Sequence, residues 1–196
     1  MITKEKTCWI TTFVHKKKFD LLNPNPDDIH IEDIAYSLAH VCRFTGHVRR
    51  FYSVAEHCMN MTLNLPKELQ LAGLLHDASE AYLNDINSPL KSTDELQGYK
   101  KIENKIQIAI FNKYGIPLTV GFNPKIKEID KKLLYKEASI SLGLSHNDLL
   151  EWGATDYSYT SIKLKDIINP DDSLLTVDQY FAKIRRNYTD IFLSLI

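Results

Sequence analysis

The stretch LQLAGLLHDASEAYL, residues 69–83, decides the fold of this 196-residue chain. Its apolar residues surround a helical axis, which is typical of a buried, central helix. We therefore predict one continuous helix over residues 67–83. His76, Asp77 and Glu80 fall inside it, and His76 and Glu80, four residues apart, are expected to share a face.

Most of the remaining sequence also has a helical pattern. Apolar residues recur at helical spacing, and capping residues mark most of the expected helix starts. The caps are Ser53 with Glu56, Ser92 with Glu95, Asn123 with Pro124, and Thr176 with Gln179. The expected helices cover residues 31–42, 53–63, 92–115, 124–143 and the region from 176 onward.

The N-terminal region departs from this helical pattern. Residues 9–14 (WITTFV) and 16–22 (KKKFDLL) are short β-prone runs around a basic turn, which predicts a small hairpin. The chain has no internal repeat and no Gly/Ser-rich linker. We expect a single domain over residues 1–196, in the all-α class with a small N-terminal β hairpin.

Composition excludes several classes of protein. The 24 Lys and Arg residues balance 25 Asp and Glu residues, for a net charge of −1, so no strongly basic surface for nucleic acid is expected. No apolar run approaches the roughly 20 residues of a membrane span, and the first residues do not resemble a signal peptide. The irregularly spaced Cys8, Cys42 and Cys58 are typical of reduced thiols. We expect a cytoplasmic protein that binds neither nucleic acid nor membranes.

Several polar side chains fall on the apolar faces of the expected helices. Asp130 and Glu137 project from the apolar stripe of the helix over 124–143, and His57 lies beside the stripe of the helix over 53–63. The stripe residues are Ile126, Ile129, Leu133 and Ile140 in the first helix and Val54, Cys58 and Met61 in the second. A buried charge is costly unless it is paired or coordinates a metal ion.

Two interpretations of these inward polar groups stay open at this level. Imidazole and carboxylate groups from three helices suit a transition-metal ion such as Mn, Fe, Co or Zn, which could activate a water near neutral pH. Taken one at a time, however, an inward histidine is often a hydrogen-bonded core residue. Asp130 and Glu137 could also form ion pairs with Lys or Arg.

Four motifs, in this order, resemble the HD-domain phosphohydrolases, and most closely the small nucleotidases of bacteria and phages. They are RFTGH (residues 43–47), YSVAEH (52–57), LLHDASEAY (74–82) and DINSPLK (85–91). The resemblance covers about residues 28–140. It implies a helical HD-domain bundle that holds one divalent metal ion, which could be Mn, Co, Fe, Zn or Mg. The implied metal ligands are His57, His76, Asp77 and Asp130, with Asp148 as the rival for the last position.

The same resemblance implies roles for residues near the metal. Glu80 and Asp85 would act on the water and the phosphate, and Arg43 and Lys91 would bind the phosphate. Ordinary alternatives remain: Arg43 could cap the preceding helix, Lys91 could be a solvated loop residue, and Glu80 could orient a ligand. Residues 84–87 read Asn-Asp-Ile-Asn where relatives usually have Gly-Asp-Ile-Pro, a departure that bears on substrate fit.

The expected activity is that of a 5′-deoxyribonucleotidase, which releases phosphate from nucleoside monophosphates. The alternative is a triphosphohydrolase acting, for example, on dATP, for which Arg49, Arg50 and Lys91 would have to converge on the pocket. A nucleotide is the expected partner, and a homo-oligomer is expected, with the apolar residues 191–196 available to a second copy. Two further hypotheses are an inactive nucleotide-binding HD domain and a structural zinc module built from His40, Cys42, His47 and Cys58.

Overall fold

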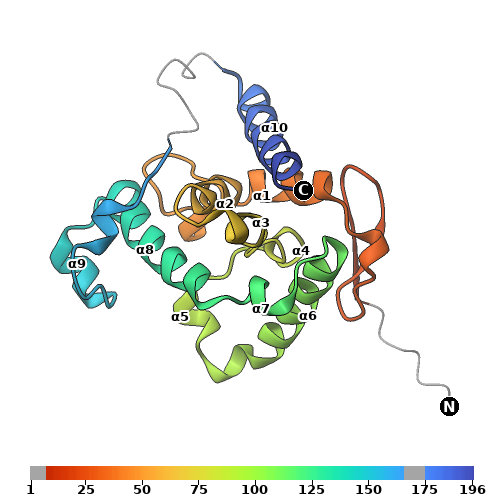
Figure 1. The fold of residues 1–196 in the computed structure, drawn as a ribbon, viewed down its shortest axis with the longest axis horizontal. Helices are drawn as coiled ribbons and strands as arrows, with labels where there is room; N and C mark the ends of the chain where they lie inside the picture. Colours follow the sequence, from red (N-terminus) through yellow and green to blue (C-terminus); the bar gives the residue numbers. More distant parts are fainter. Residues whose placement is uncertain (1–7, 166–174) are drawn as a thin grey trace.

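Helices make up most of the computed structural model, which describes residues 8–165 and 175–196 (Figure 1). A two-stranded antiparallel hairpin precedes them, with Ile10 opposite Phe19. The all-α class with a small N-terminal β hairpin is therefore confirmed. In chain order the elements are β1 (Trp9–Thr11), β2 (Lys18–Asp20), η1 (Pro26–Asp28), α1 (Ile31–His40), η2 (Arg43–Gly46), α2 (Val54–Thr62), α3 (Lys67–Leu74), α4 (Glu80–Leu83), α5 (Ser88–Lys91), η3 (Asp94–Leu96), α6 (Gln97–Lys113), α7 (Leu118–Gly121), α8 (Pro124–Ser141), α9 (His146–Glu151), η4 (Ser158–Ser161) and α10 (Val177–Leu195).

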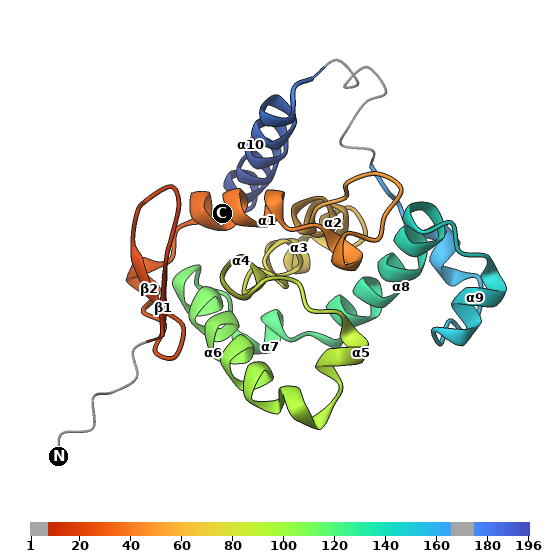
Figure 2. The ribbon, with the colours of Figure 1, turned by 180° about the vertical axis from the view of Figure 1, so that it is seen from behind.

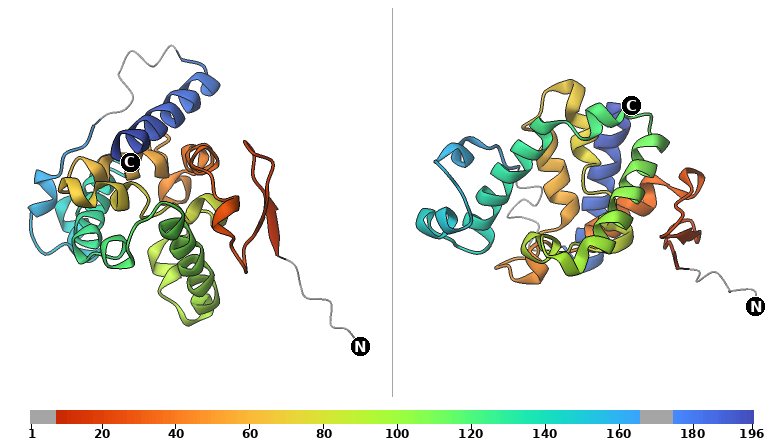
Figure 3. Two further views of the ribbon diagram at one scale, coloured as in Figure 1. Left: turned by 45° about the vertical axis from the view of Figure 1, so that its right-hand side comes forward. Right: turned by 90° about the horizontal axis from the view of Figure 1, so that it is seen from below.

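The central helix is α2, rather than the segment over 67–83. Every residue of α2 is buried, and the helix contacts α1, α3, α8 and α10. The C-terminal helix α10 packs against α1, α2 and α3, and Figure 3 shows it lying along this group of helices. None of the helices among the described residues is both long and apolar enough to cross a bilayer.

Local capping explains where the central helix begins. The Ser53 hydroxyl accepts a hydrogen bond from the Glu56 backbone N–H at 3.1 Å, and the Glu56 carboxylate accepts one from the Ser53 N–H at 2.7 Å. This reciprocal pair satisfies N–H groups that have no partner within the helix. The predicted caps at Asn123 and Thr176 are also confirmed: Asn123 accepts a hydrogen bond from the Lys125 N–H, and Thr176 forms the reciprocal pair with Gln179.

Two details of the sequence prediction are wrong. Ser92 does not cap a helix, because its hydroxyl donates to the Pro89 carbonyl at the end of α5; α6 begins later, at Gln97, and has no side-chain cap. Ile140 does not belong to the buried stripe of α8, since it is 56% exposed.

The predicted continuous helix over 67–83 is also wrong, because the chain leaves helical geometry after Leu74 and resumes it at Glu80. In an uninterrupted helix the Ser79 N–H would donate to the Leu75 carbonyl. Instead, the buried side chain of Gln107 stands between them: its Nε2 donates to Leu75 O at 2.7 Å, and its Oε1 accepts from Ser79 N at 3.1 Å. A side chain inserted into the backbone ladder is a known cause of helix breaks.

The hairpin is fastened to α1 at one end of the molecule, opposite α9 (Figure 2). Asp33 of α1 is buried and accepts hydrogen bonds from the Val14 N–H at 2.7 Å and from His15 Nδ1 at 2.9 Å. Phe19 of β2 is buried and stacks on Tyr82 of α4, with the ring centroids 4.1 Å apart. The hairpin therefore packs against both α1 and α4.

Replacement of Gln107 by alanine should destabilise the fold. The substitution leaves the buried Ser79 N–H without its partner and removes one of the two hydrogen bonds that the Leu75 carbonyl accepts, the other coming from the Ala78 N–H. It should therefore lower the free energy of unfolding by about 1–3 kcal/mol. Urea denaturation followed by circular dichroism would measure the change. Asn104→Ala, at an exposed position of the same helix, is the control and should change stability by less than about 0.5 kcal/mol. Equal effects of the two variants would contradict this role for Gln107.

Candidate metal centre

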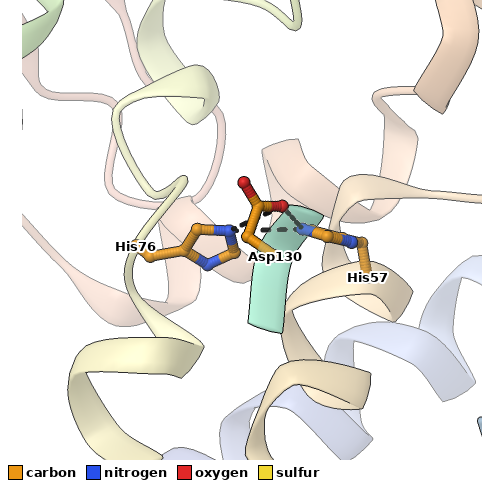
Figure 4. A group of neighbouring side chains, drawn as sticks. All are labelled: His57, His76 and Asp130. Atoms are coloured by element: carbon orange, nitrogen blue, oxygen red, sulfur yellow. Dashed lines mark hydrogen bonds and ion pairs between the residues drawn. The ribbon is translucent and has the colours of Figure 1, made fainter. Parts of the chain in front are cut away.

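Two histidines and two aspartates from three parts of the chain meet beside the central helix. His57 lies on α2, His76 and Asp77 lie in the turn between α3 and α4, and Asp130 lies on α8. Figure 4 shows the His57 and His76 rings directed toward each other with the Asp130 carboxylate next to them. The Nε2 atoms of the two histidines are 3.2 Å apart, and Asp130 Oδ1 is 3.1 Å from His57 Nε2.

The spacing of these atoms fits a shared metal ion. Asp77 Oδ2 lies 3.1 Å from His76 Nε2 and 3.6 Å from His57 Nε2, and Asp130 Oδ1 lies 3.8 Å from His76 Nε2. Ligands held about 2.1 Å from one tetrahedral or octahedral ion are separated by about 3.0–3.4 Å. These residues could therefore hold a divalent metal ion: His57, His76 and Asp130 form one group of possible ligands, and Asp77 belongs to a second group that shares His76 with it.

Hydrogen bonds on the far side of each ring favour the metal-binding tautomer. His57 Nδ1 lies 2.8 Å from Glu137 Oε1, and His76 Nδ1 lies 2.8 Å from the Gly73 carbonyl oxygen. Both partners accept hydrogen bonds, so each Nδ1 is the donor and carries a hydrogen. In the neutral rings the Nε2 lone pairs then face each other, an arrangement that requires a cation or a proton between them.

The charges around the site agree with this requirement. Burial lowers the pKa of His76, but the charge of Asp77 and hydrogen bonds to Asp77 and Asp130 outweigh it and raise that pKa well above its usual value. Burial also opposes the charged form of Asp77 by raising its pKa, but the charge of His76 and a hydrogen bond to it outweigh this and lower the pKa of Asp77 to about 2. The carboxylates are thus ionised and available to a cation. Asp130 is the most open of the four, with 39% of its side chain exposed.

Behind His57 lies a buried layer of polar residues that the sequence did not reveal as a unit. Glu137, 1% exposed, accepts a hydrogen bond from the Tyr52 hydroxyl at 2.8 Å on the same oxygen that faces His57. Its other oxygen lies 3.1 Å from Arg43 Nε, an ion pair without hydrogen-bond alignment. Asn60 in turn donates to the Tyr52 hydroxyl. Glu137 is seven residues after Asp130, which places both on the same face of α8.

Arg43 is held beside the site by an unusual turn. Its backbone N–H donates to the Tyr52 carbonyl at 2.9 Å, and the next two residues, Phe44 and Thr45, have φ values of 55° and 54°. Left-handed backbone at such residues costs energy and is often found next to functional sites. Arg43 Nη1 lies 3.9 Å from Asp77 Oδ2. The guanidinium therefore faces the acidic site, and the alternative role as a helix cap is wrong.

Glu80 and Lys91 form a second buried pair near the site. The Lys91 ammonium donates to Glu80 Oε1 at 3.0 Å and to Glu103 Oε1 at 2.7 Å, so Lys91 is not a solvated loop residue. The other oxygen of Glu80 is buried without a hydrogen-bond partner among the described residues. Burial and the charges of Asp77 and Asp85 raise the pKa of Glu80 well above its usual value, despite the opposing effect of Lys91.

Glu80 and Asp85 both line a cavity of about 760 Å³. The structure therefore places both predicted catalytic residues at one cavity. Because the helix breaks before Glu80, the predicted shared face of His76 and Glu80 does not exist. Glu80 bonds to Lys91 rather than to a histidine ligand.

The structure excludes two alternatives. Asp148 is not a ligand, because its carboxylate caps α9 by accepting hydrogen bonds from Ser145. The zinc hypothesis is wrong as well: among residues 8–165 and 175–196, His40, Cys42 and His47 belong to no cluster of metal-binding groups. Cys58 does lie near His76 and Asp77, apart from the other three residues of the zinc hypothesis, and burial raises the pKa of its thiol to about 11.

Two curated bacterial proteins are similar to this chain. The chain is 34% identical over 140 residues to RCAP_rcc00048 of Rhodobacter capsulatus, which covers 66% of the chain and 71% of that protein. The chain belongs to the family of this Rhodobacter protein. It is also 50% identical over 93 residues, 47% of the chain, to YfdR of Escherichia coli, and the match spans about half of the length of YfdR. Both relatives are named as uncharacterized proteins. The chain matches none of the known protein-family models.

Removal of either imidazole should abolish metal binding. Purified His57→Ala and His76→Ala should each contain less than about a tenth of the metal of the unsubstituted chain, because each loses one ligand of a four-residue site. Elemental analysis after growth with added Mn or Co measures the content. His146→Ala, on α9 and outside the cluster, is the control and should retain full metal content. Full metal content in both site variants would contradict the assignment.

Glu137 should matter for metal affinity even though it is not a ligand. Glu137→Gln keeps the shape but weakens the charged partner of His57 Nδ1, so metal affinity should fall about 10- to 100-fold. Competition with a metal-sensitive dye would measure it. Glu128→Gln is the matched control, since Glu128 lies on the same helix and, among the described residues, pairs with Lys125 and Lys132 away from the candidate ligands. Unchanged affinity in Glu137→Gln would show that His57 is oriented without it.

Proposed function

We propose that this chain is a metal-dependent phosphohydrolase of the HD type that releases phosphate from nucleoside monophosphates. The observation that carries the proposal is the close approach of His57, His76, Asp77 and Asp130, in the chain order that the HD resemblance implies. The resemblance supplies the reaction class. The donor set of imidazoles and carboxylates fits a divalent ion such as Mn, Fe, Co or Zn.

Hydrolysis joins a water oxygen to phosphorus while the bond from phosphorus to the sugar oxygen breaks, and that oxygen must gain a proton. A divalent ion held by these residues would supply Lewis acidity and lower the pKa of a water. Glu80 is well placed to orient that water or carry a proton, because one of its oxygens has no hydrogen-bond partner among the described residues. Such a group contributes about 10²- to 10⁴-fold to a rate. Asp85 lines the same cavity and would assist it.

The cationic residues suit a single phosphoryl group. Arg43 faces the ligands, with Nη1 3.9 Å from Asp77 Oδ2, and would stabilise the phosphate by charge and hydrogen bonding. Lys91 would act through Glu80, to which it donates at 3.0 Å.

The positions of two cationic residues favour a monophosphate over a triphosphate. The Arg49 guanidinium packs against Gly143, and Lys91 is paired with Glu80 and Glu103. Two of the three cations that a triphosphate would need are therefore already engaged elsewhere.

A nucleotide panel tests the proposed function. The chain loaded with Mn or Co should release inorganic phosphate from deoxynucleoside monophosphates, and Asp77→Asn should reduce the rate by about 10²-fold or more because a metal ligand is lost. Asp148→Asn, which alters only an exposed cap, should keep full activity. Release of triphosphate from a deoxynucleoside triphosphate would favour the alternative activity. A metal-loaded chain that hydrolyses none of the nucleotides would contradict the proposal.

A further inference from the structure

The cavity beside the candidate centre has a second wall that the metal site does not use. It is formed by the hairpin and the facing side of α1. Glu80 and Asp85 also line the cavity, and Glu80 follows the candidate ligand Asp77 by three residues, whereas none of the four candidate ligands lines it. Its volume of about 760 Å³ lies within the range of about 300–1,000 Å³ that is usual for small-molecule sites. The HD resemblance begins only at about residue 28, so it implies nothing about the hairpin wall.

This wall is rigid because both of its parts are anchored. Asp33 binds the end of the hairpin through the Val14 N–H and His15. Phe13 of the hairpin stacks on Tyr36 of α1 with ring centroids 4.3 Å apart, and Tyr36 stacks on His40 at 4.5 Å. A wall held in this way is preorganised, so a ligand loses little free energy in ordering it.

The chemistry of the wall differs from that of a phosphate site. The hairpin and α1 contribute apolar, aromatic and hydroxyl side chains to the lining, including Ile10, Thr11, Tyr36 and Ser37, together with the His40 imidazole. The Asp33 carboxylate, which also lines the cavity, is already bonded to the hairpin. Such a surface suits an uncharged group with aromatic area and a few hydrogen-bonding edges. Because Glu80 and Asp85, the predicted acid–base residues, line the same cavity, a phosphoester with its phosphate at the candidate metal centre could extend its remainder into the cavity.

We propose that this cavity binds the nucleoside part of the substrate and that the N-terminal hairpin is the wall that determines which nucleosides fit. The inference rests on the proposed phosphohydrolase function and adds to it a specificity-determining element. Thr11 is the best position for a test, because it lines the cavity and is exposed. A larger side chain there narrows the cavity without entering the protein core.

The experiment compares Thr11→Trp with Lys17→Trp, a control that adds the same bulk to an exposed hairpin position outside the cavity lining. One readout is the ratio of kcat/KM for a deoxynucleoside monophosphate to kcat/KM for glycerol phosphate, whose leaving group is too small to need the cavity. The other readout is calorimetric binding of a deoxynucleoside, without phosphate, to the metal-free protein. Thr11→Trp should reduce both by about tenfold or more, and Lys17→Trp should change neither by more than about twofold.

Unchanged nucleoside affinity in Thr11→Trp, or an equal loss in Lys17→Trp, would overturn the inference. If Thr11→Trp does not fold, Thr11→Tyr narrows the cavity by a smaller step and should give a smaller loss in the same direction. Failure of the unsubstituted chain to hydrolyse either ester would contradict the proposed function alone. In that case the nucleoside-binding comparison would still decide whether the cavity is a nucleoside site.

Discussion

Two imidazole nitrogens and two carboxylate oxygens, gathered within a few ångströms beside a fully buried helix, impose the main constraint on this protein. His57 Nε2 and His76 Nε2 face each other at 3.2 Å because Glu137 and the Gly73 carbonyl occupy the opposite side of each ring. Such a group is stable only when a cation or protons neutralise it. The surrounding structure brings these charged and polar groups together, since α2, α8 and the turn after α3 each supply one side of the site.

The turn after α3 shows how the rest of the fold serves the site. A continuous helix would have fixed the positions of His76, Asp77 and Glu80 around a single axis. Gln107 of α6 takes the hydrogen bonds of Leu75 and Ser79 instead, so the chain turns between the two ligands and Glu80. His76 and Asp77 then face the metal centre, while Glu80 faces the cavity and Lys91. One buried amide thus separates metal binding from the predicted acid–base residue.

Much of the site could be predicted from the sequence because a polar residue on an apolar helical face must be buried. His57 and Asp130 were found in this way, and both lie in the cluster. Glu137 was recognised as an inward carboxylate, but its role was not, because Tyr52 and Arg43 reach it from a loop more than 80 residues earlier. Gln107 gave no signal at all, since its function depends on backbone groups of another segment that would bond to each other in a regular helix.

The sequence by itself determined the helical class, the hairpin, the capped starts of α2, α8 and α10, and the residue types that must avoid water, because these properties follow from local hydrogen bonding and the periodicity of apolar residues. The tertiary structure alone decided which polar groups meet, where the helix over 67–83 breaks, and that the hairpin forms a wall of the cavity. Those outcomes depend on contacts between segments distant in the chain, such as Asp33 with the hairpin and Gln107 with the turn after α3. Local patterns carry no information about the partner in such a contact.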